Sequence, residues 1–410
     1  MKLPQITILA DDLTGAADAA GFFGELGLTA IVSLDSTAIR TGDVVVINTH
    51  SRHLAHDDAI QQNTLALQRL LTLQASFPSG WIYKKIDSTL RGHPGAELNA
   101  LMNILGIPHA LLAPAFPDQG RTTVAGIQHV NGQPLERTPF HDQVSTSSLR
   151  DLFTEHANGR QLQHIDLSIV RSGVAAVGAL LQERSPALFI ADAETNQDLR
   201  ILARAAIAQD IKLSCGSAGL SRAFGQVLNL RSSAPPPRVP IRESGPVLVI
   251  AGSQHPATCR QVERASASGI VVISPTSLDI RAVQTAIAHL SQGRDVILAT
   301  NQLGAHPGKE QETAQGLGRM ARAIADRVHL GGLTLTGGDT AMAVLQSLGC
   351  RTLWLRGEME PGIPWGRVLT GTQPGLAVVT KAGGFGSDQS LSSVIGHLKH
   401  KRMRRQHVST

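Results

Sequence analysis

Two adjacent acidic residues follow the first apolar run of the chain. Residues 6–10 are aliphatic, and Asp11, Asp12, Thr14 and Gly15 come directly after them. Neighbouring carboxylates repel each other and lose hydration when they are buried, unless a cation, a proton or a substrate compensates them. Either aspartate could instead cap the helix that is expected to follow. The pair therefore indicates a polar ligand site or a helix cap.

A second polar segment, residues 84–93, combines several kinds of hydrogen-bonding side chain. It lies between an apolar run and a predicted helix that begins near Gly95, and it contains Lys84, Lys85, Asp87, Ser88, Thr89, Arg91 and His93. A solvated turn rarely concentrates so many different donors, so we expect this segment to bind a polar ligand. A shorter polar segment, residues 48–52, ends at Arg52, whose guanidinium is suited to binding a carboxylate through two hydrogen bonds.

Three small-residue turns in the second half of the chain have the composition of anion sites. Each follows an apolar run and leads into a helix or a glycine-rich loop, so that backbone N–H groups can face a phosphate. The turns are residues 252–258, 337–341 and 381–386, and they contain Ser253, Gly337, Gly338, Asp339, Thr340, Lys381, Gly383 and Gly384. We expect Lys381 to add a point charge. Neither the P-loop pattern nor the dinucleotide pattern G-x-G-x-x-G is present in its required context.

Short aliphatic runs that alternate with helical periodicity must position these segments. Buried strands are predicted at residues 6–10, 44–47, 110–113, 188–191, 247–251, 271–273, 296–299, 333–336 and 377–380. This alternation is typical of α/β proteins whose mostly parallel sheets are flanked by helices. Ligands of such sheets bind beyond the carboxyl ends of the strands, which is where the polar segments and the glycine turns lie.

A Pro-rich segment suggests where the chain divides. The length of 410 residues favours two domains, and the three consecutive prolines within residues 231–238 favour extended geometry. We predict a first domain at residues 1–230, a linker at 231–245, a second domain at 246–398 and a basic tail at 399–410. A surface loop inside one domain is the alternative to the linker.

The composition argues against several classes of partner. Five of the 37 Lys and Arg residues lie in the last fourteen residues, so the remaining 32 balance the 32 acidic residues. A balanced body with few aromatic residues is not typical of nucleic-acid binding. The three cysteines have neither disulfide nor zinc spacing, and no protein-bound metal site is expected. Because no signal peptide and no apolar stretch of membrane-spanning length is evident, we expect a cytoplasmic protein without a membrane partner.

In their order along the chain, these motifs resemble the four-carbon acid sugar kinase family, formerly a domain of unknown function. The resemblance rests on ADDLTGAAD at 10–18, KKIDSTLRGHPGAEL at 84–98, APAFPDQGRTT at 113–123, GSAGL at 216–220, AGSQHPAT at 251–258, TGGDTA at 336–341, GEMEPGIPWG at 357–366 and KAGGFGSDQSL at 381–391. It implies an amino-terminal domain that binds a sugar acid, a carboxyl-terminal domain that binds ATP, and an active site in the interdomain cleft.

The resemblance also assigns roles by matching position. Asp12 is similar to the family's substrate-contacting aspartate and catalytic base, with Asp11 as the alternative base. Arg52, Lys85, Asp87 and Ser88 resemble its sugar-acid contacts, and we add Arg91, which with Arg52 would fix the substrate carboxylate and hydroxyls. Residues that resemble or adjoin its ATP contacts are Ser253, Gly337, Gly338, Asp339, Thr340, Gly383 and Gly384. His93 stands where the family often has Asn.

The expected reaction is ATP-dependent phosphorylation of the C4 hydroxyl of a four-carbon sugar acid, with Mg²⁺ bridging the ATP phosphates. D-Threonate is the first expectation, and D-erythronate and 3-oxo-tetronate are alternatives. A haloacid dehalogenase-type phosphatase would need a second Asp at i+2, where this chain has Leu13 or Thr14. A non-catalytic nucleotide sensor is disfavoured because the polar cluster of the first half is complete. The sequence does not decide the oligomeric state, for which we consider a homodimer.

Overall fold

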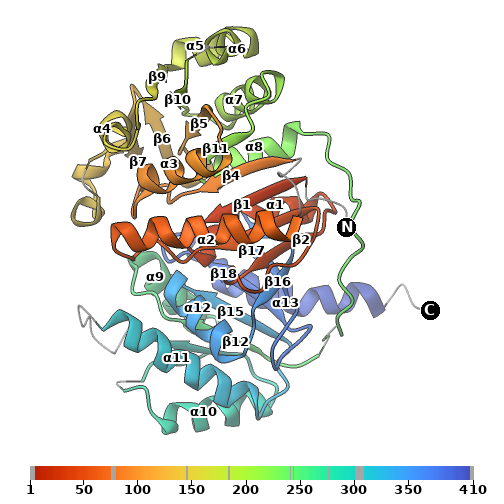
Figure 1. Cartoon of the computed structure of the whole chain (residues 1–410). Helices are drawn as coiled ribbons and strands as arrows, with labels where there is room; N and C mark the ends of the chain where they lie inside the picture. Colours follow the sequence, from red (N-terminus) through yellow and green to blue (C-terminus); the bar gives the residue numbers. More distant parts are fainter. Residues whose placement is uncertain are drawn as a thin grey trace. The chain divides into compact units, whose positions relative to one another are not determined.

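The computed structural model describes residues 5–74, 80–144, 146–182, 185–240, 242, 244–275, 277–300 and 309–406. The chain divides into two compact units, residues 1–235 and 236–410, and each is an α/β structure with a helix-covered sheet (Figure 1). The predicted fold class of mostly parallel sheets flanked by helices is confirmed. In the part of the chain that the structure describes, no helix has the length and apolar character needed to cross a membrane.

The first unit is built on a parallel sheet with the strand order β2-β3-β1-β4-β11-β5-β10-β9. The strands are short aliphatic runs, and β1, β3, β10 and β11 are buried along their whole length. Their bounds are Ile6–Ala10 (β1), Ala30–Ser33 (β2), Val44–Asn48 (β3), Trp81–Lys85 (β4), His109–Ala113 (β5), Gln161–Ile165 (β9), Ala187–Ala191 (β10) and Leu213–Gly216 (β11).

Helices cover both faces of this sheet. The helices are α1 (Leu13–Glu25), α2 (His56–Gln74), α3 (Pro94–Leu105), α4 (Leu149–Thr154), α5 (Leu167–Arg171), α6 (Val174–Leu181), α7 (Asn196–Ala208) and α8 (Ala218–Val227). Leu9 of β1 shares a hydrophobic core with Leu67 of α2 and Leu101 of α3. Because side chains alternate along a strand, Ile6 and Ile8 face the other side, where α1 packs against α8. A small antiparallel sheet of β6 (Arg121–Val124), β7 (Ile127–Val130) and β8 (Gln133–Pro134) is attached to this unit.

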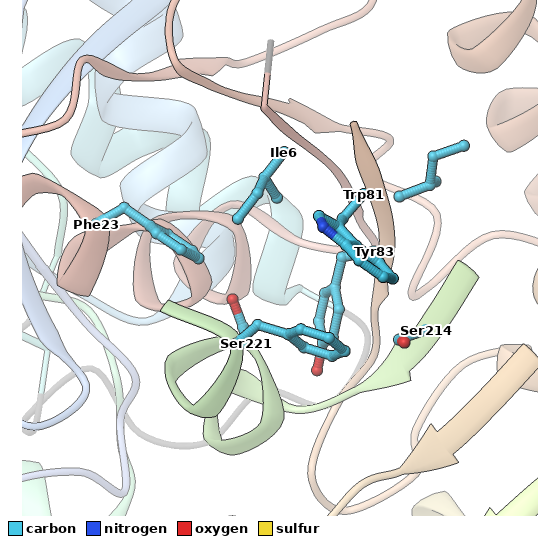
Figure 2. A pocket seen from close by; sticks show the side chains of 8 residues that line it. Ile6, Phe23, Trp81, Tyr83, Ser214 and Ser221 are labelled. Atoms are coloured by element: carbon cyan, nitrogen blue, oxygen red, sulfur yellow. The ribbon is translucent and has the colours of Figure 1, made fainter. Parts of the chain in front are cut away.

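An apolar cavity lies between α1, α8 and the sheet of the first unit (Figure 2). Phe23, Tyr83, Ser214 and Ser221 are among the residues that line it, together with Ile6 at the first position of β1. The polar segments that the sequence singles out follow the opposite, carboxyl ends of the same strands. The cavity is therefore separate from the candidate site described below.

The second unit has a sheet with the strand order β13-β14-β12-β15-β18-β17-β16, in which β17 is antiparallel to its two neighbours. The strands are β12 (Val247–Ala251), β13 (Val271–Ile273), β14 (Val296–Ala299), β15 (Gly332–Thr336), β16 (Thr352–Glu360), β17 (Ile363–Val368) and β18 (Ala377–Lys381). The helices are α9 (Pro256–Ala267), α10 (Ile280–Ser291), α11 (Glu310–Ala325), α12 (Gly338–Ser347) and α13 (Ser390–Gln406). Its core joins residues of β12, β14, β18, α9 and α13.

The division between the two units falls between Pro235 and Pro236, inside the Pro-rich segment. The residues before it are anchored on the first unit, because the buried carboxylate of Asp43 accepts hydrogen bonds from the N–H groups of Ser233 and Ala234, each at 2.9 Å. The start of this segment, from Arg231, is thus ordered by side-chain capping of its backbone. The residues up to Ala234 are therefore held on the first unit by these hydrogen bonds.

Candidate functional site

The polar residues of the first unit meet because three adjacent parallel strands end together. In the order β3-β1-β4, Ala10 pairs with Asn48 on one side and with Lys85 on the other. The residues that follow these strands, 11–12, 49–52 and 86–91, therefore emerge at one edge of the sheet. The sequence-predicted residues Asp12, Arg52, Lys85, Asp87, Ser88 and Arg91 all belong to this edge.

Arg52 lies at the centre of the cluster. Its Nε and Nη2 donate to the two carboxylate oxygens of Asp11 at 2.8 and 2.9 Å, and Nη2 also donates to Oδ1 of Asp12 at 2.6 Å. Oδ1 of Asp87 is 4.0 Å from Nη2. Burial opposes the charge of this guanidinium, but the three carboxylates raise the pKa of Arg52 well above its usual value. The side chain expected to hold a substrate carboxylate thus holds the chain's own aspartates.

Asp12 is a helix cap, one of the two roles that its sequence position left open, and it also belongs to the charged cluster. As the N-cap of α1 it accepts a hydrogen bond from the N–H of Gly15 at 2.9 Å, and its Oδ2 accepts from the hydroxyl of Thr14 at 2.5 Å. Burial acts to raise the pKa of Asp12, but Arg52 and Lys85 lower it below its usual value, so the carboxylate is ionised at neutral pH. Its side chain is 11% exposed against 4% for Asp11, so Asp12 offers more surface to a ligand.

Asp87 and Arg91 form a second ion pair beside the first. Nε and Nη2 of Arg91 donate to the carboxylate oxygens of Asp87 at 2.6 and 3.2 Å, and the hydroxyl of Thr89 donates to the same carboxylate. Burial acts to raise the pKa of Asp87, yet Arg91 and Arg52 hold it well below its usual range. Arg91 is the more accessible partner, with 28% of its side chain exposed.

The turn that carries Asp87 and Arg91 needs an unusual backbone. Gly92 has a φ of 86°, and a Cβ at this position would meet the backbone of Arg52 at 3.3 Å. The hydroxyl of Ser88 makes no hydrogen bond with the described residues, whereas its carbonyl accepts from Nε2 of Gln128 at 2.8 Å. His93 follows the turn, and its ring Nε2 lies 2.9 Å from the carbonyl oxygen of Leu54, within hydrogen-bond distance.

The two neighbouring lysines of β4 have different surroundings. Nζ of Lys85 donates to the carbonyl of Ile86 at 2.8 Å and lies on the side of Asp12 and Gly15. Lys84 points to the opposite face, where its Nζ is 2.5 Å from Oε2 of Glu97 in a fully buried ion pair. Alternation along the strand separates them, so Lys85 belongs to the candidate site and Lys84 is a structural residue.

Two further charged residues join the cluster without having been singled out from the sequence. Asp18 is one helical turn beyond Gly15; burial raises its pKa to about 6, although Lys85 and Arg222 oppose the shift. Arg121 lies at the start of β6. Burial lowers its pKa, and the carboxylate of Asp87 opposes this shift. Helical spacing from Gly15 could have indicated Asp18, but no local pattern places Arg121 near Asp87.

If the cluster binds the sugar acid that the sequence resemblance implies, Gly15→Ala should lower turnover by about tenfold, the effect of displacing one hydrogen-bonded charged group. A Cβ at this position would lie 2.4 Å from Oδ1 of Asp12 and 2.8 Å from Nζ of Lys85, so both groups must move. The preference of Ala over Gly in a helix, about 0.5–1 kcal/mol, opposes the loss of the Asp12 cap, about 0.5–2 kcal/mol, so the net change in stability should be small. Gly396→Ala in α13 is the matched control, since nothing lies within 4 Å of that Cβ. Steady-state kinetics and thermal melting of both variants give the comparison, and unchanged kinetics for Gly15→Ala would contradict the close packing.

The glycine turns of the second unit also meet at one edge of a sheet. The strands β12, β15 and β18 are adjacent and parallel, and Thr336 pairs with Ala251 and with Lys381. A Cβ on Gly383 would lie 2.1 Å from Oγ of Ser253, and one on Gly252 would lie 2.1 Å from Oγ1 of Thr340. These contacts leave no room for side chains, so the glycines let the three turns pack together.

The two helices that follow these turns differ at their amino termini. Nδ1 of His255, the N-cap of α9, accepts from the N–H of Ala257 at 3.1 Å. The N-cap of α12 is Gly337, with a φ of 93° and no side-chain hydrogen bond to the first turn. Uncapped N–H groups at a helix start are suited to binding an anion. Gly338 and Thr340 lie in this first turn, and the carboxylate of Asp339 is exposed there.

The expected role of Lys381 as a point charge for a phosphate does not fit its position. The residue is 1% exposed, and its Nζ donates to backbone carbonyls of the 382–385 turn. A side chain enclosed in this way does not extend to a ligand outside the turn. Among the residues that the structure describes, no group of three or more His, Cys, Asp and Glu side chains is arranged to hold a metal ion.

Comparison with family models divides the chain in two. A model described as a sugar-binding N-terminal domain matches residues 6–224, and one described as a nucleotide-binding C-terminal domain matches residues 248–391. Each match lies within one of the two compact units.

Several relatives match along almost their whole length. A D-threonate kinase of Cupriavidus necator is 36% identical, with 94% of this chain and 95% of the relative covered. A D-threonate kinase of Salmonella typhimurium is 32% identical, with 96% and 98% covered, and a 3-oxo-tetronate kinase of Pseudomonas fluorescens is 29% identical, with 96% and 97% covered. The crystal structure of a Salmonella typhimurium protein shares the fold, with a TM-score of 0.77, 24% identity, and 95% of this chain and 98% of that chain covered.

Proposed function

Because the chain belongs to the four-carbon acid sugar kinase family, we propose that it transfers the γ-phosphoryl group of ATP to the C4 hydroxyl of D-threonate. The observation that carries this proposal is the cluster around Asp12 in the first unit, where two guanidinium groups and an ammonium group surround buried carboxylates at the ends of adjacent strands. Such a cluster can bind an anionic, hydroxyl-rich molecule and orient one hydroxyl toward a base.

We assign the base role to Asp12. Phosphoryl transfer depends mainly on alignment and charge stabilisation, with a carboxylate that orients the attacking hydroxyl and accepts its proton. Asp12 is ionised and is held by Thr14, Gly15 and Arg52. Asp11 also accepts from Arg52 at both carboxylate oxygens, but its side chain is 4% exposed against 11% for Asp12, so Asp12 is the more accessible carboxylate. The sugar-acid carboxylate is left to the accessible Arg91, the hydroxyl of Ser88 and Nη1 of Arg52, which makes no hydrogen bond with the described residues.

ATP is assigned to the glycine turns of the second unit. The uncapped first turn of α12, Gly338–Thr340, and the turn of Gly383 and Gly384 supply N–H groups for phosphate oxygens, and Ser253 adds a hydroxyl next to Gly383. The N–H of Gly337 instead donates to the carbonyl of Lys381 at 2.9 Å, which holds the two turns together. When bound, Mg²⁺ would neutralise the phosphates; it usually keeps several waters and uses few protein ligands, so the exposed carboxylate of Asp339 is a sufficient candidate contact. Transfer requires both substrates to meet, so an active site in the interdomain cleft stays a prediction, as does a homodimer.

The choice of D-threonate rests on the relatives. The two relatives reported above 30% identity are named D-threonate kinases, while the 3-oxo-tetronate kinase is 29% identical. A comparison of the three acids as substrates tests this choice.

We expect D-threonate to give a kcat/KM about tenfold or more above D-erythronate and 3-oxo-tetronate, because a hydrogen-bonding site rejects a stereoisomer or a keto analogue that leaves its polar groups unpaired. ADP production with each acid, in the presence of ATP and Mg²⁺, measures this. A higher kcat/KM for either competitor would show that this acid is the preferred substrate, and the assignment as a four-carbon acid sugar kinase would still hold. Binding of ATP without turnover of any four-carbon acid would instead favour the nucleotide sensor.

A further inference from the structure

The ammonium group of Lys381 is enclosed by oxygen atoms. Its Nζ donates to the carbonyls of Ala382 at 3.0 Å, Gly383 at 3.2 Å and Phe385 at 3.1 Å, and it lies 3.3 Å from Oγ1 of Thr258. The Thr258 hydroxyl in turn donates to the carbonyl of Gly383 at 2.8 Å. A lysine has three N–H donors and no acceptor, so these oxygens satisfy it completely. The arrangement resembles the oxygen shell of a bound monovalent cation.

The carbonyls that face Lys381 leave the opposite side of the backbone free. The N–H of Phe385 bonds to the carbonyl of Ala382 at 3.1 Å within the turn. In contrast, the N–H groups of Gly383, Gly384 and Gly386 make no hydrogen bond with the described residues. Gln261 of α9 reinforces the turn, since its Nε2 donates to the carbonyls of Phe385 and Ser387 at 3.0 and 2.9 Å.

Burial of this charge is unfavourable for the fold alone. Desolvation lowers the pKa of Lys381 to about 8, and the carboxylate of Glu360 opposes the shift. An apolar side chain of similar length would avoid this desolvation penalty. The lysine is therefore better explained by the conformation that it imposes on the turn than by stability.

We propose that Lys381 is a positioning residue for nucleotide binding, whose ammonium group acts as an internal monovalent cation: it draws the carbonyls of the 382–385 turn inward and leaves the glycine N–H groups free for phosphate oxygens. The inference rests on the proposed nucleotide site of the second unit. It gives Lys381 an indirect role, because the enclosed ammonium group shapes the backbone and does not contact the phosphate.

Lys381→Met tests the proposal, because Met keeps an unbranched stem and removes the donors. We expect ADP to bind about 10- to 100-fold more weakly, the usual effect of losing hydrogen bonds to a charged group, with D-threonate affinity unchanged; isothermal titration measures both. In the nucleotide-free protein, the amide hydrogen of Phe385, which bonds to the carbonyl of Ala382 within the turn, should exchange faster in the variant. Lys399→Met is the matched control, since Lys399 is 43% exposed in the same unit, and neither readout should change.

The possible results separate this inference from the proposed function. Wild-type ADP affinity in Lys381→Met, or unchanged amide exchange in the turn, overturns the role of Lys381. If Lys381→Met does not fold, Lys381→Ala is titrated with propylammonium chloride, which supplies the missing side-chain atoms, and with sodium chloride as the control salt. Greater recovery of folding and ADP binding with propylammonium chloride than with sodium chloride supports the proposal. Equal recovery with the two salts overturns it. If the wild-type protein binds no nucleotide, the proposed function fails, while amide exchange still tests whether Lys381 orders the turn.

Discussion

Asp12→Asn is expected to lower turnover by a factor of about 10² or more, in line with the contribution of a general base. The substitution removes the negative charge that accepts the hydroxyl proton and that pairs with Arg52 at 2.6 Å. Asn is as good an N-cap as Asp, so the hydrogen bond from the N–H of Gly15 should remain and α1 should still form. ADP production at saturating D-threonate and ATP measures the turnover, and circular dichroism confirms the fold.

Asp166→Asn is the matched control for this experiment. Asp166 is the N-cap of α5 and accepts from the N–H of Ile169, so the chemical change is the same outside the cluster. Its turnover should equal that of the wild type. A larger loss in Asp11→Asn than in Asp12→Asn would transfer the base role to Asp11, and near-normal turnover in Asp12→Asn would rule out the assignment.

Arg52→Met is expected to destabilise the protein by about 3–5 kcal/mol, because removing one partner of a buried ion pair leaves the other charge uncompensated. Asp11, Asp12 and Asp87 all lose their shared cation, and the guanidinium is only 8% exposed, so water cannot replace it. Turnover should fall by about 10²–10³, as for loss of a positioned donor in an active site. Urea unfolding and steady-state kinetics give the two effects.

The destabilisation in Arg52→Met should depend on pH. In the wild type the pKa values of Asp12 and Asp87 are lowered, so their ion pairs add stability above the unfolded pKa of about 3.9 and lose it as the pH falls through the folded values. In the variant, burial without the cation raises these pKa values, and protonation at low pH relieves the buried charge. The difference in free energy of unfolding between wild type and variant should therefore narrow toward about pH 4.

Two comparisons check the interpretation of Arg52. Arg52→Lys keeps the charge without the paired donors, so it should recover part of the stability and little of the activity. Arg171→Met removes a half-exposed arginine that pairs with Glu194, and it should change the stability little, because exposed ion pairs are screened by water. Equal stabilities of Arg52→Met and wild type at neutral pH would contradict the central role of this ion pair.

The sequence by itself determined the fold class and the location of the polar segments. Aliphatic runs such as residues 6–10 and 247–251 form buried strands, because strand formation and burial depend on local side-chain pattern. Parallel strands bring their carboxyl ends to one edge, so Asp12, Arg52 and Asp87 could be expected to meet before any contact was known. The same rule joins Ser253 to Gly383 in the second unit.

The tertiary structure decided what each charge contacts. Arg52 binds the chain's own aspartates, Lys84 and Lys85 point to opposite faces of one strand, and Lys381 turns into its own loop. Asp18 and Arg121 belong to the cluster, although the sequence did not predict them there. Side-chain pattern reports which residues are polar and near a strand end. The partner of a buried charge depends on strand alternation, turn dihedrals and ångström-scale distances between segments far apart in the chain, and these are fixed only when the whole unit packs.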